Sequence, residues 1–279
     1  MAGASPGQPN DDRDYPPYVN FEYVREDPSI TPMWMGSPTY DAERDAPFAD
    51  VIPATYAVMD AMVSDTLDRM GDETLLIVMS DHGFTSWRRT FHLNAWLHQN
   101  GYLAVKDESL PETEALLNVD WSGTRAYGIG LNGLYVNVAG RERDGIVPTE
   151  ERAALVAEIA ERLEAVVDPA TEQPVVTRVY LRDETFVDGG HREIGPDAVI
   201  GYAKHTRGAD PSALGVVGRE TLTDNAKAWS GDHGMYTPSV PGILATSRPL
   251  KRPAENLREL HYSVLAEFGL EPSAEAGNR

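Results

Sequence analysis

An amphipathic helix followed at once by a short apolar run is the pattern that most constrains the fold of this chain. Apolar side chains recur at steps of three and four from Ile52 to Met70, which predicts one apolar face of a helix, and Gly71 is placed to end it. The run Thr74–Met79 follows directly, and such a run after a helix is typical of a strand buried in a parallel sheet. A helix paired with a buried strand predicts an α/β layered fold.

The same alternation continues towards the C-terminus. A second helix is predicted over Glu151–Val167 and a last one over about Glu255–Phe268. Further strands are predicted at Leu134–Val138, Val175–Leu181, Ala198–Tyr202 and Gly242–Ala245. We therefore expect an α/β fold with a mostly parallel sheet sandwiched by helices.

Length and charge narrow the classes of protein that fit. The 279 residues allow one large α/β domain or two small ones. With 24 basic against 44 acidic residues the formal net charge is −20, which argues against nucleic acid or an anionic membrane as a partner. The chain has no cysteine, so disulfides, thiolate metal sites and cysteine nucleophiles are excluded. No apolar run is long enough for a membrane span, and the first residues lack the features of a signal peptide, so no compartment is predicted.

The first chemically suggestive motif, Asp81-His82-Gly83, follows the predicted strand that ends at Met79. In open α/β sheets ligands collect at the carboxyl ends of strands. A carboxylate and an imidazole on neighbouring residues can reach one metal ion if the backbone turns sharply, and Gly83 permits such a turn. Oxygen and nitrogen ligands of this kind suit zinc, manganese or iron. The alternative is a buried histidine that pairs only with its neighbour's carboxylate.

A second copy of the motif, Asp232-His233-Gly234, lies about 150 residues later, in a glycine-flanked loop before a predicted strand. Two such loops can converge on one metal cluster, and histidine is the commonest metal ligand among side chains. In the alternative interpretation the second motif is a loop turn without a ligand role.

Several segments together resemble the type I phosphodiesterase/nucleotide pyrophosphatase branch of the alkaline phosphatase superfamily. The resemblance covers most of the chain from Phe21 to Pro272 and is much more specific than either Asp-His-Gly motif alone. The segments that carry it are Tyr56–Asp60, Leu76–Phe84, Leu93–Leu97, Gly101–Leu103, Thr124–Tyr127, Leu134–Asn137, Gly140–Glu142, Gly145–Val147, Pro196–Asp197 and Gly231–Gly234.

The resemblance implies a hydrolase of phosphodiesters or nucleotide pyrophosphate bonds with two divalent metal ions, zinc in the first place and manganese or iron as alternatives. By residue matching, Asp81 and His82 would hold one ion, and His233 and Asp27 the other. The implied partner is a small-molecule phosphate ester or nucleotide.

Two departures from the family pattern shape the expectation further. Thr31 stands where the family has a histidine, four residues after Asp27, so the ion shared with His233 would be held weakly. The segment that supplies the family's nucleophile has no counterpart before Asp27, so we expect a partial domain and assign no catalytic residue. The expected division is a disordered lead over 1–17, the partial domain over 18–272 with an inserted subdomain around 104–210, and a tail over 273–279.

Alternatives to a phosphodiesterase remain open at this point. One is a catalytically inactive domain that binds a metal or a partner. Another is a different activity of the superfamily, such as a sulfatase or a phosphoglycerate mutase, although the segments Asn94–Leu97 and Gly140–Glu142 favour phosphodiesterase.

The remaining histidines have simpler interpretations. Those that flank or lie within predicted helices are expected to be structural: His92, His98 and His261. His191 lies in a glycine-rich turn that can approach a substrate, and His205 lies in a polar stretch with Lys204 and Arg207, where the charges can neutralise a phosphate. A solvated loop is the alternative for both.

Overall fold

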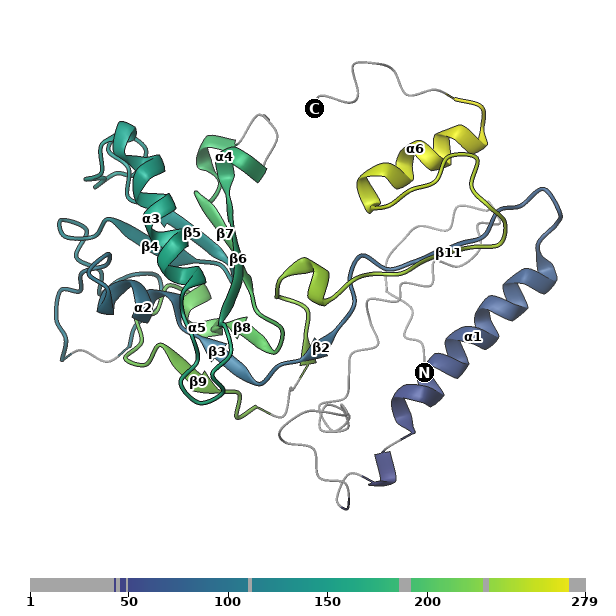
Figure 1. Cartoon of the computed structure of the whole chain (residues 1–279), viewed down its shortest axis with the longest axis horizontal. Coiled ribbons are helices and arrows are strands. Elements are labelled where there is room, and N and C mark those ends of the chain that lie inside the picture. Colours follow the sequence, from purple (N-terminus) through teal and green to yellow (C-terminus); the bar gives the residue numbers. More distant parts are fainter. Residues whose placement is uncertain are drawn as a thin grey trace, which may run out of the picture.

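The computed structural model describes residues 43, 46–48, 50–109, 112–185, 192–227 and 231–270. These residues form helices and several small β-sheets, so the predicted α/β class is confirmed (Figure 1). None of the helices in these ranges has the length and apolar character to cross a membrane. The expected lead over 1–17, the expected tail over 273–279 and the candidate ligand Asp27 lie outside the described residues.

The three helices predicted from periodicity are present within a few residues of their expected bounds. They are α1 (Val51–Arg69), α3 (Arg152–Glu164) and α6 (Leu257–Glu267). The Asn256 side chain caps α6 by accepting a hydrogen bond from the Glu259 backbone N–H. The shorter helices are α2 (Leu93–Gln99), α4 (Arg182–Thr185) and α5 (Asp210–Ala213), with 3₁₀ turns η3 (Ala46–Phe48), η4 (Thr149–Glu151), η5 (Arg192–Ile194) and η6 (Thr237–Ser239).

The largest sheet has four strands in the order β4-β5-β7-β6, and each neighbouring pair is antiparallel. The strands are β4 (Ala126–Ile129), β5 (Gly133–Val136), β6 (Val176–Leu181) and β7 (Ala198–Tyr202). Gly130, in the short loop from β4 to β5, has a φ of +71°, a backbone conformation that glycine adopts at little cost. A loop this short can join only antiparallel neighbours.

Three smaller sheets complete the fold. In the first, β3 (Arg89–Phe91) lies between β8 (Thr206–Gly208), which is parallel to it, and β9 (Leu222–Asp224), which is antiparallel. The other two are antiparallel pairs: β2 (Thr85–Ser86) with β10 (Gly231–Asp232), and β1 (Ile77–Met79) with β11 (Leu244–Thr246).

The expectation of a mostly parallel sheet is wrong for the described residues, because β3 and β8 form the one parallel pair among these strands. The run before Asp81 is not a strand buried on both faces: β1 has half-buried and exposed side chains and pairs with β11 alone in an antiparallel ribbon. An apolar run predicts a strand but carries no information on the direction of its neighbour, and the short connection between β4 and β5 already forces antiparallel pairing there.

The core lies between α3 and the four-stranded sheet. Leu155, Ile159 and Leu163 recur on one face of α3, and they are buried in one cluster with Val179 and Ile200 of the sheet. Figure 1 shows α3 lying across β5, β6 and β7. This spacing of three to four residues is the reason why the helix was predictable and why its apolar face points to the sheet.

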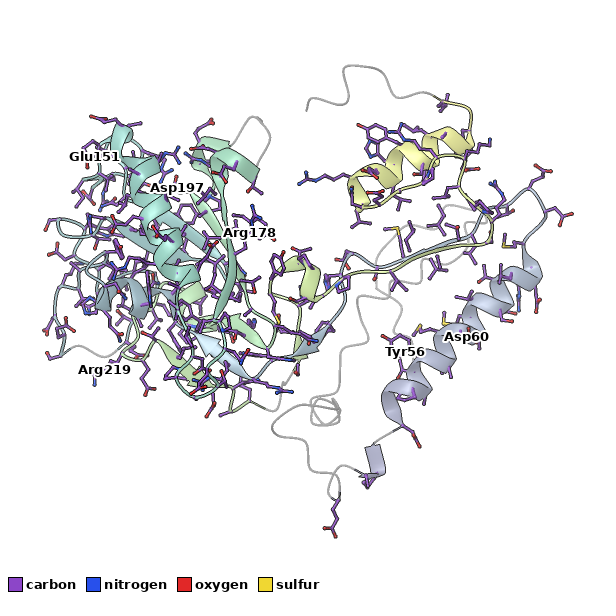
Figure 2. All side chains as sticks on the ribbon, in the orientation of Figure 1. Tyr56, Asp60, Glu151, Arg178, Asp197 and Arg219 are labelled. Carbon is purple, nitrogen blue, oxygen red and sulfur yellow. The ribbon has the colours of Figure 1, made fainter. Side chains whose placement is uncertain are left out.

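A cluster of buried ion pairs connects the N-terminus of α3 to the edge of the core. The Asp197 carboxylate has no exposed side-chain surface, and guanidinium groups of Arg141, Arg152 and Arg182 lie 2.6, 3.2 and 3.2 Å from it. Its Oδ2 also accepts a hydrogen bond of 2.7 Å from the Val136 backbone N–H. These contacts hold the pKa of Asp197 below its usual value although burial opposes the charged form. Figure 2 shows Asp197 in this packed part, far from Tyr56 and Asp60 on α1.

Candidate functional site

The first Asp-His-Gly loop follows β1, and its glycine allows it to pass close to the segment Val240–Pro241. The Gly83 N–H donates to the carbonyl oxygen of Val240 at 2.9 Å, and a Cβ on Gly83 would lie 2.6 Å from the carbonyl oxygen of Pro241. A side chain larger than hydrogen would therefore push the two chain segments apart. This close approach fixes the direction in which the preceding Asp81 and His82 leave the strand.

Within this loop Asp81 and His82 contact each other. The His82 backbone N–H donates to Asp81 Oδ1 at 3.0 Å, and His82 Nε2 lies 3.5 Å from Asp81 Oδ2. His82 Nδ1 lies 2.9 Å from the carbonyl oxygen of Gly83. Because a carbonyl oxygen can only accept, this contact places a proton on Nδ1, and the neutral tautomer that fits it has its lone pair on Nε2.

The second Asp-His-Gly loop is held by the carboxylate of its own aspartate. Asp232 Oδ1 accepts hydrogen bonds of 2.7 Å from the backbone N–H groups of His233 and Gly234. Asp232 is buried, at 8% exposure. Asp232 Oδ1 therefore closes a loop turn, as the alternative interpretation of this motif expected, while Oδ2 lies 2.8 Å from Arg207 Nε.

A two-residue antiparallel pairing brings the two loops together. In β2 and β10, Ser86 lies opposite Gly231 and Thr85 opposite Asp232. The first motif precedes Thr85, and the second begins at Asp232, the partner of Thr85, so both motifs lie at the same end of this pairing. Segments about 150 residues apart in the sequence meet here for this reason.

The two motif histidines stack on each other. The ring centroids of His82 and His233 are 3.6 Å apart, and the rings are parallel to within 3°. The Phe84 ring lies beside both, at 6.4 Å from His82 and 5.7 Å from His233. Partial burial and, after it, the neighbouring His82 lower the pKa of His233, although Asp232 and Asp81 act in the opposite direction. At neutral pH the His233 ring is therefore uncharged and has a lone pair to offer.

Of the four candidate ligands, the structure gathers Asp81, His82 and His233 in one place, while Asp27 lies outside the described residues together with Thr31. Among the described residues, no group of three or more His, Cys, Asp or Glu side chains is arranged to hold a metal ion. His191 also lies outside the described residues.

Two interpretations of charged loop residues change with the structure. His205 is not solvated in a loop: its Nδ1 lies 2.7 Å from Ser86 Oγ, in the turn before β8. Arg207 lies within β8 and pairs with two carboxylates, Asp210 at 2.7 Å and Asp232 at 2.8 Å, so its charge already has partners. The sequence pattern missed the link from Arg207 to the second motif, because nothing in the local sequence shows that β8 and β10 are neighbours in space.

The other histidines match their structural interpretation. His92 stands at the N-terminus of α2, with Nε2 3.2 Å from Thr223 Oγ1. His98 lies in the last turn of α2, where its Nδ1 is 2.9 Å from the carbonyl oxygen of Leu103. His261 lies in α6 with its ring against Tyr262.

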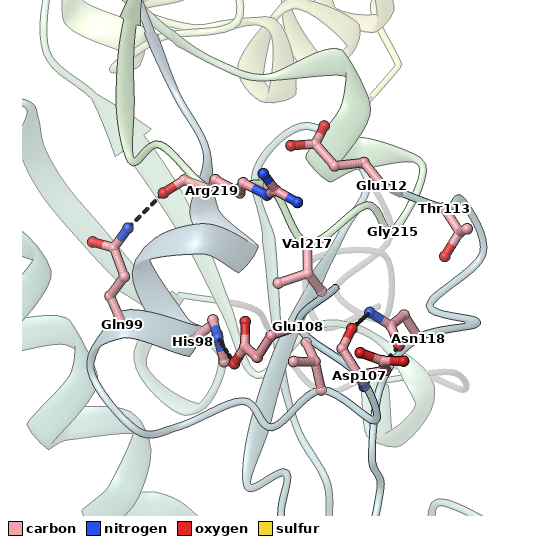
Figure 3. A pocket seen from close by; sticks show the side chains of 12 residues that line it. His98, Gln99, Asp107, Glu108, Glu112, Thr113, Asn118, Gly215, Val217 and Arg219 are labelled. Carbon is pink, nitrogen blue, oxygen red and sulfur yellow. Dashed lines mark hydrogen bonds and ion pairs between the residues drawn. The ribbon is translucent and has the colours of Figure 1, made fainter. Parts of the chain in front are cut away.

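A cavity of about 260 Å³ lies away from the two motifs, between the end of α2 and two loops (Figure 3). His98, Glu108, Glu112 and Arg219 are among its lining side chains, and His98 pairs with Glu108 at 3.0 Å. None of the three described candidate ligands, Asp81, His82 and His233, lines this cavity, so it is separate from the place where these three meet.

Comparison with known proteins supports the family resemblance. A family model described as type I phosphodiesterase/nucleotide pyrophosphatase matches residues 18–207, more than half of the chain. This range includes Asp27 and the first Asp-His-Gly motif, and it stops before the second. Searches of curated proteins and of solved structures found no match. The chain belongs to the type I phosphodiesterase/nucleotide pyrophosphatase family.

Proposed function

We propose that this chain is a metal-dependent hydrolase of phosphodiester or nucleotide pyrophosphate bonds, with its metal site at the paired Asp-His-Gly loops. Membership of the family indicates a phosphoester hydrolase. The observation that carries the proposal further is the parallel stack of His82 on His233, 3.6 Å apart, with Asp81 alongside.

The donor chemistry of these three residues fits a divalent metal. His82 has its proton on Nδ1, bonded to the carbonyl oxygen of Gly83, and this second contact is the usual way in which a protein orients a metal-binding imidazole. In this tautomer Nε2 would offer its lone pair to the ion beside Asp81 Oδ2. His233 is kept uncharged by its surroundings, as a metal ligand must be.

The stacking favours two ions over one. A lone pair of imidazole lies in the plane of the ring, so two parallel rings direct their lone pairs to different points. The ring separation of 3.6 Å is close to the spacing of roughly 3.5–4 Å between the ions of two-metal sites. We therefore assign His82 with Asp81 to one ion and His233 with Asp27 to the other.

Asp81, His82, His233 and Asp27 would hold the ions, which would supply positive charge that stabilises the charge developing on the phosphoryl group. The Asp81 carboxylate would balance positive charge next to His82, and Gly83 would keep the loop at the end of β1 in place. Zinc suits this nitrogen and oxygen donor set best, with manganese or iron as alternatives. We assign no residue as the nucleophile.

The second candidate function is a domain that binds metal or a partner without catalysis. Within the described ranges no group of three or more donors is arranged for a metal, which favours the partner-binding form of this candidate. The two candidates differ in turnover, because only the first hydrolyses a phosphodiester.

The test uses the full chain, stripped of metal and then given Zn²⁺ or Mn²⁺. We expect bound metal after dialysis, and hydrolysis of bis(4-nitrophenyl) phosphate above the rate of the metal-free chain. Loss of a residue that only hydrogen-bonds to a metal ligand weakens metal binding by roughly 10- to 100-fold. His82→Ala and His233→Ala remove the ligands themselves, so each should weaken metal binding by more than this. His261→Ala on α6 is the matched control and should keep both metal and activity. Metal binding without hydrolysis would favour the second candidate, and unchanged binding in both histidine variants would refute the site.

The assignment of Asp27 has a test of its own. Thr31 stands where the family has a second imidazole, so Thr31→His should tighten the binding of one of the two ions, most for a metal that prefers nitrogen such as zinc. Metal stoichiometry and affinity after dialysis measure this. If the substitution changes neither, Thr31 is not at the ligand position and the assignment of Asp27 falls.

A further inference from the structure

We infer that Arg207 is a positioning residue that holds the second Asp-His-Gly loop so that the His233 ring lies against His82. The chain of contacts has three links: Arg207 to Asp232, Asp232 to the backbone of His233, and His233 to His82. Its consequence for metal binding rests on the proposed function, whereas the positioning itself does not.

The first link starts from an arginine that cannot move freely. The Arg207 side chain is 12% exposed, and its guanidinium carbon lies 4.5 Å from the centre of the Trp87 ring. One edge of the group pairs with Asp210 through Nη1 at 2.7 Å. Nε lies 2.8 Å from Asp232 Oδ2, in an ion pair whose N–H is not directed at the oxygen. Ring and carboxylates thus hold the group from three directions.

The second link runs through the two oxygens of Asp232, which have different partners. Oδ2 faces Arg207, while Oδ1 accepts the N–H groups of His233 and Gly234, both at 2.7 Å. A carboxylate held at one oxygen keeps a defined orientation at the other. The orientation of the His233 backbone therefore depends on the position of the Arg207 guanidinium.

The third link is the stack itself, which joins this loop to the first motif. Arg207 reaches it from a different sheet: in the parallel pairing of β3 and β8, Arg207 lies opposite Thr90. The position of His233 therefore depends on β8, a strand of the packed core, and not only on its own short loop.

A lysine would not replace Arg207 here. The planar guanidinium offers several N–H groups in a fixed fork and can lie on an aromatic ring, while an ammonium is a point charge on a flexible stem. If charge alone mattered, Arg207→Lys would behave like the parent. If the geometry matters, Arg207→Lys should lose most of the effect.

The experiment follows the stack directly in the metal-free full chain. Stacked rings shift each other's proton resonances, so the ring protons of His82 and His233, assigned by NMR, report the contact. In Arg207→Met and in Arg207→Lys we expect these protons to move towards the positions of unstacked histidine. The matched control is Arg89→Met, which breaks another buried arginine–aspartate pair, Arg89–Asp168, on the neighbouring strand β3 and should leave the stack signals in place.

A second variant keeps the test decisive if Arg207→Met does not fold. Asp232→Asn retains the side-chain oxygen that accepts from His233 and Gly234 and removes the charge that attracts Arg207. We expect the same direction of shift, and in the double variant with Arg207→Met an effect smaller than the sum of the two, because both act through one contact. Unchanged stack signals in Asp232→Asn and Arg207→Lys would overturn the inference.

A metal titration separates this inference from the proposed function. Arg207→Lys should weaken Zn²⁺ binding by about tenfold or more, the usual cost of losing a partner that orients a ligand. Loss of the stack together with weaker Zn²⁺ binding supports both proposals. Loss of the stack with unchanged Zn²⁺ binding supports the positioning role and refutes the metal site at His233.

Discussion

Two regions of this molecule differ sharply in how they are packed. The packed region, residues 84–240, contains every buried hydrophobic side chain among the described residues except Leu260. The outlying region, made of α1, β1, β11 and α6 with the residue that caps α6, has exposed apolar side chains, of which Tyr56 at 72% and the capping Phe268 at 77% are the most exposed. Figure 1 shows these four elements on the opposite side of the picture from the four-stranded sheet. Both regions have amphipathic helices, so periodicity predicts a helix well and predicts its burial poorly.

The candidate site lies where the two regions meet. Its first motif follows β1 of the outlying region, and its second motif follows β10 of the packed region. Backbone hydrogen bonds close the junction: Ser80 N–H to the Ile243 carbonyl at 3.1 Å, and Gly83 N–H to the Val240 carbonyl at 2.9 Å. The geometry of the histidine stack therefore depends on both regions, although only one of them has a core.

The largest expected effect concerns the buried ion pairs of the packed region. Asp197→Ala leaves the Arg141 guanidinium without its main buried partner, and we expect a loss of about 3–5 kcal/mol in the free energy of unfolding. Asp65→Ala on α1 breaks an exposed pair with Arg69 and should cost at most about 1 kcal/mol. Urea denaturation measures both. Equal losses would refute the contrast between the regions.

Truncation of apolar side chains should give the next largest difference. Leu163 is fully buried between α3 and the sheet, so Leu163→Ala should cost about 2–5 kcal/mol. Leu67 on α1 is 44% exposed, and Leu67→Ala should stay within about 0.5 kcal/mol. The same denaturation experiment applies. A cost of several kcal/mol for Leu67→Ala would mean that Leu67 is packed against another surface, and it would contradict the contrast between the two regions.

Glycines at the junction should be intolerant to substitution, with intermediate cost. A Cβ at Gly83 or at Gly242 meets a backbone oxygen of the facing segment, of Pro241 and Ser80 respectively. We expect Gly83→Ala and Gly242→Ala to cost about 1–3 kcal/mol and to weaken the histidine stack. Gly71→Ala, where a Cβ meets nothing within 4 Å, is the control and should leave the stack unchanged. If all three variants retain the stack signals in NMR spectra, the close approach does not position the site.

The smallest expected effect is a dependence of stability on pH in the packed region. Burial lowers the pKa of His92 and of His205 below the ordinary value of 6.5. The unfolded chain then binds more protons than the folded one just below that pH, so stability is full above about 6.5 and falls as the solution is acidified. Unfolding measured from pH 7.5 to 5.5 should show this loss, and His92→Gln with His205→Gln should reduce it, leaving the part that comes from His233, whose pKa is lowered as well. A rise in stability on acidification would contradict the sign.

Several features of this protein follow from sequence alone because they depend on neighbours along the chain. The steps of three and four residues predicted α1 and α3, the last helix α6 was predicted over about Glu255–Phe268, and the strand β7 has the bounds that its apolar run predicted. The family resemblance was confirmed by the match over residues 18–207. Local periodicity and motif spacing depend only on residues that are close together in the sequence, so they can be found without tertiary information.

Strand direction and the assembly of the site were decided by the tertiary structure. The apolar run ending at Met79 predicted a strand, but its partner β11 is some 165 residues away and runs antiparallel to it. In the same way, the two Asp-His-Gly motifs predicted candidate ligands, while the pairing of β2 with β10 stacked the two rings. The contact of Arg207 with Asp232 had no local signal at all. The pattern of residue types shows which face of a helix or strand is apolar. Which other helix or strand packs against that face depends on the packing of the whole chain.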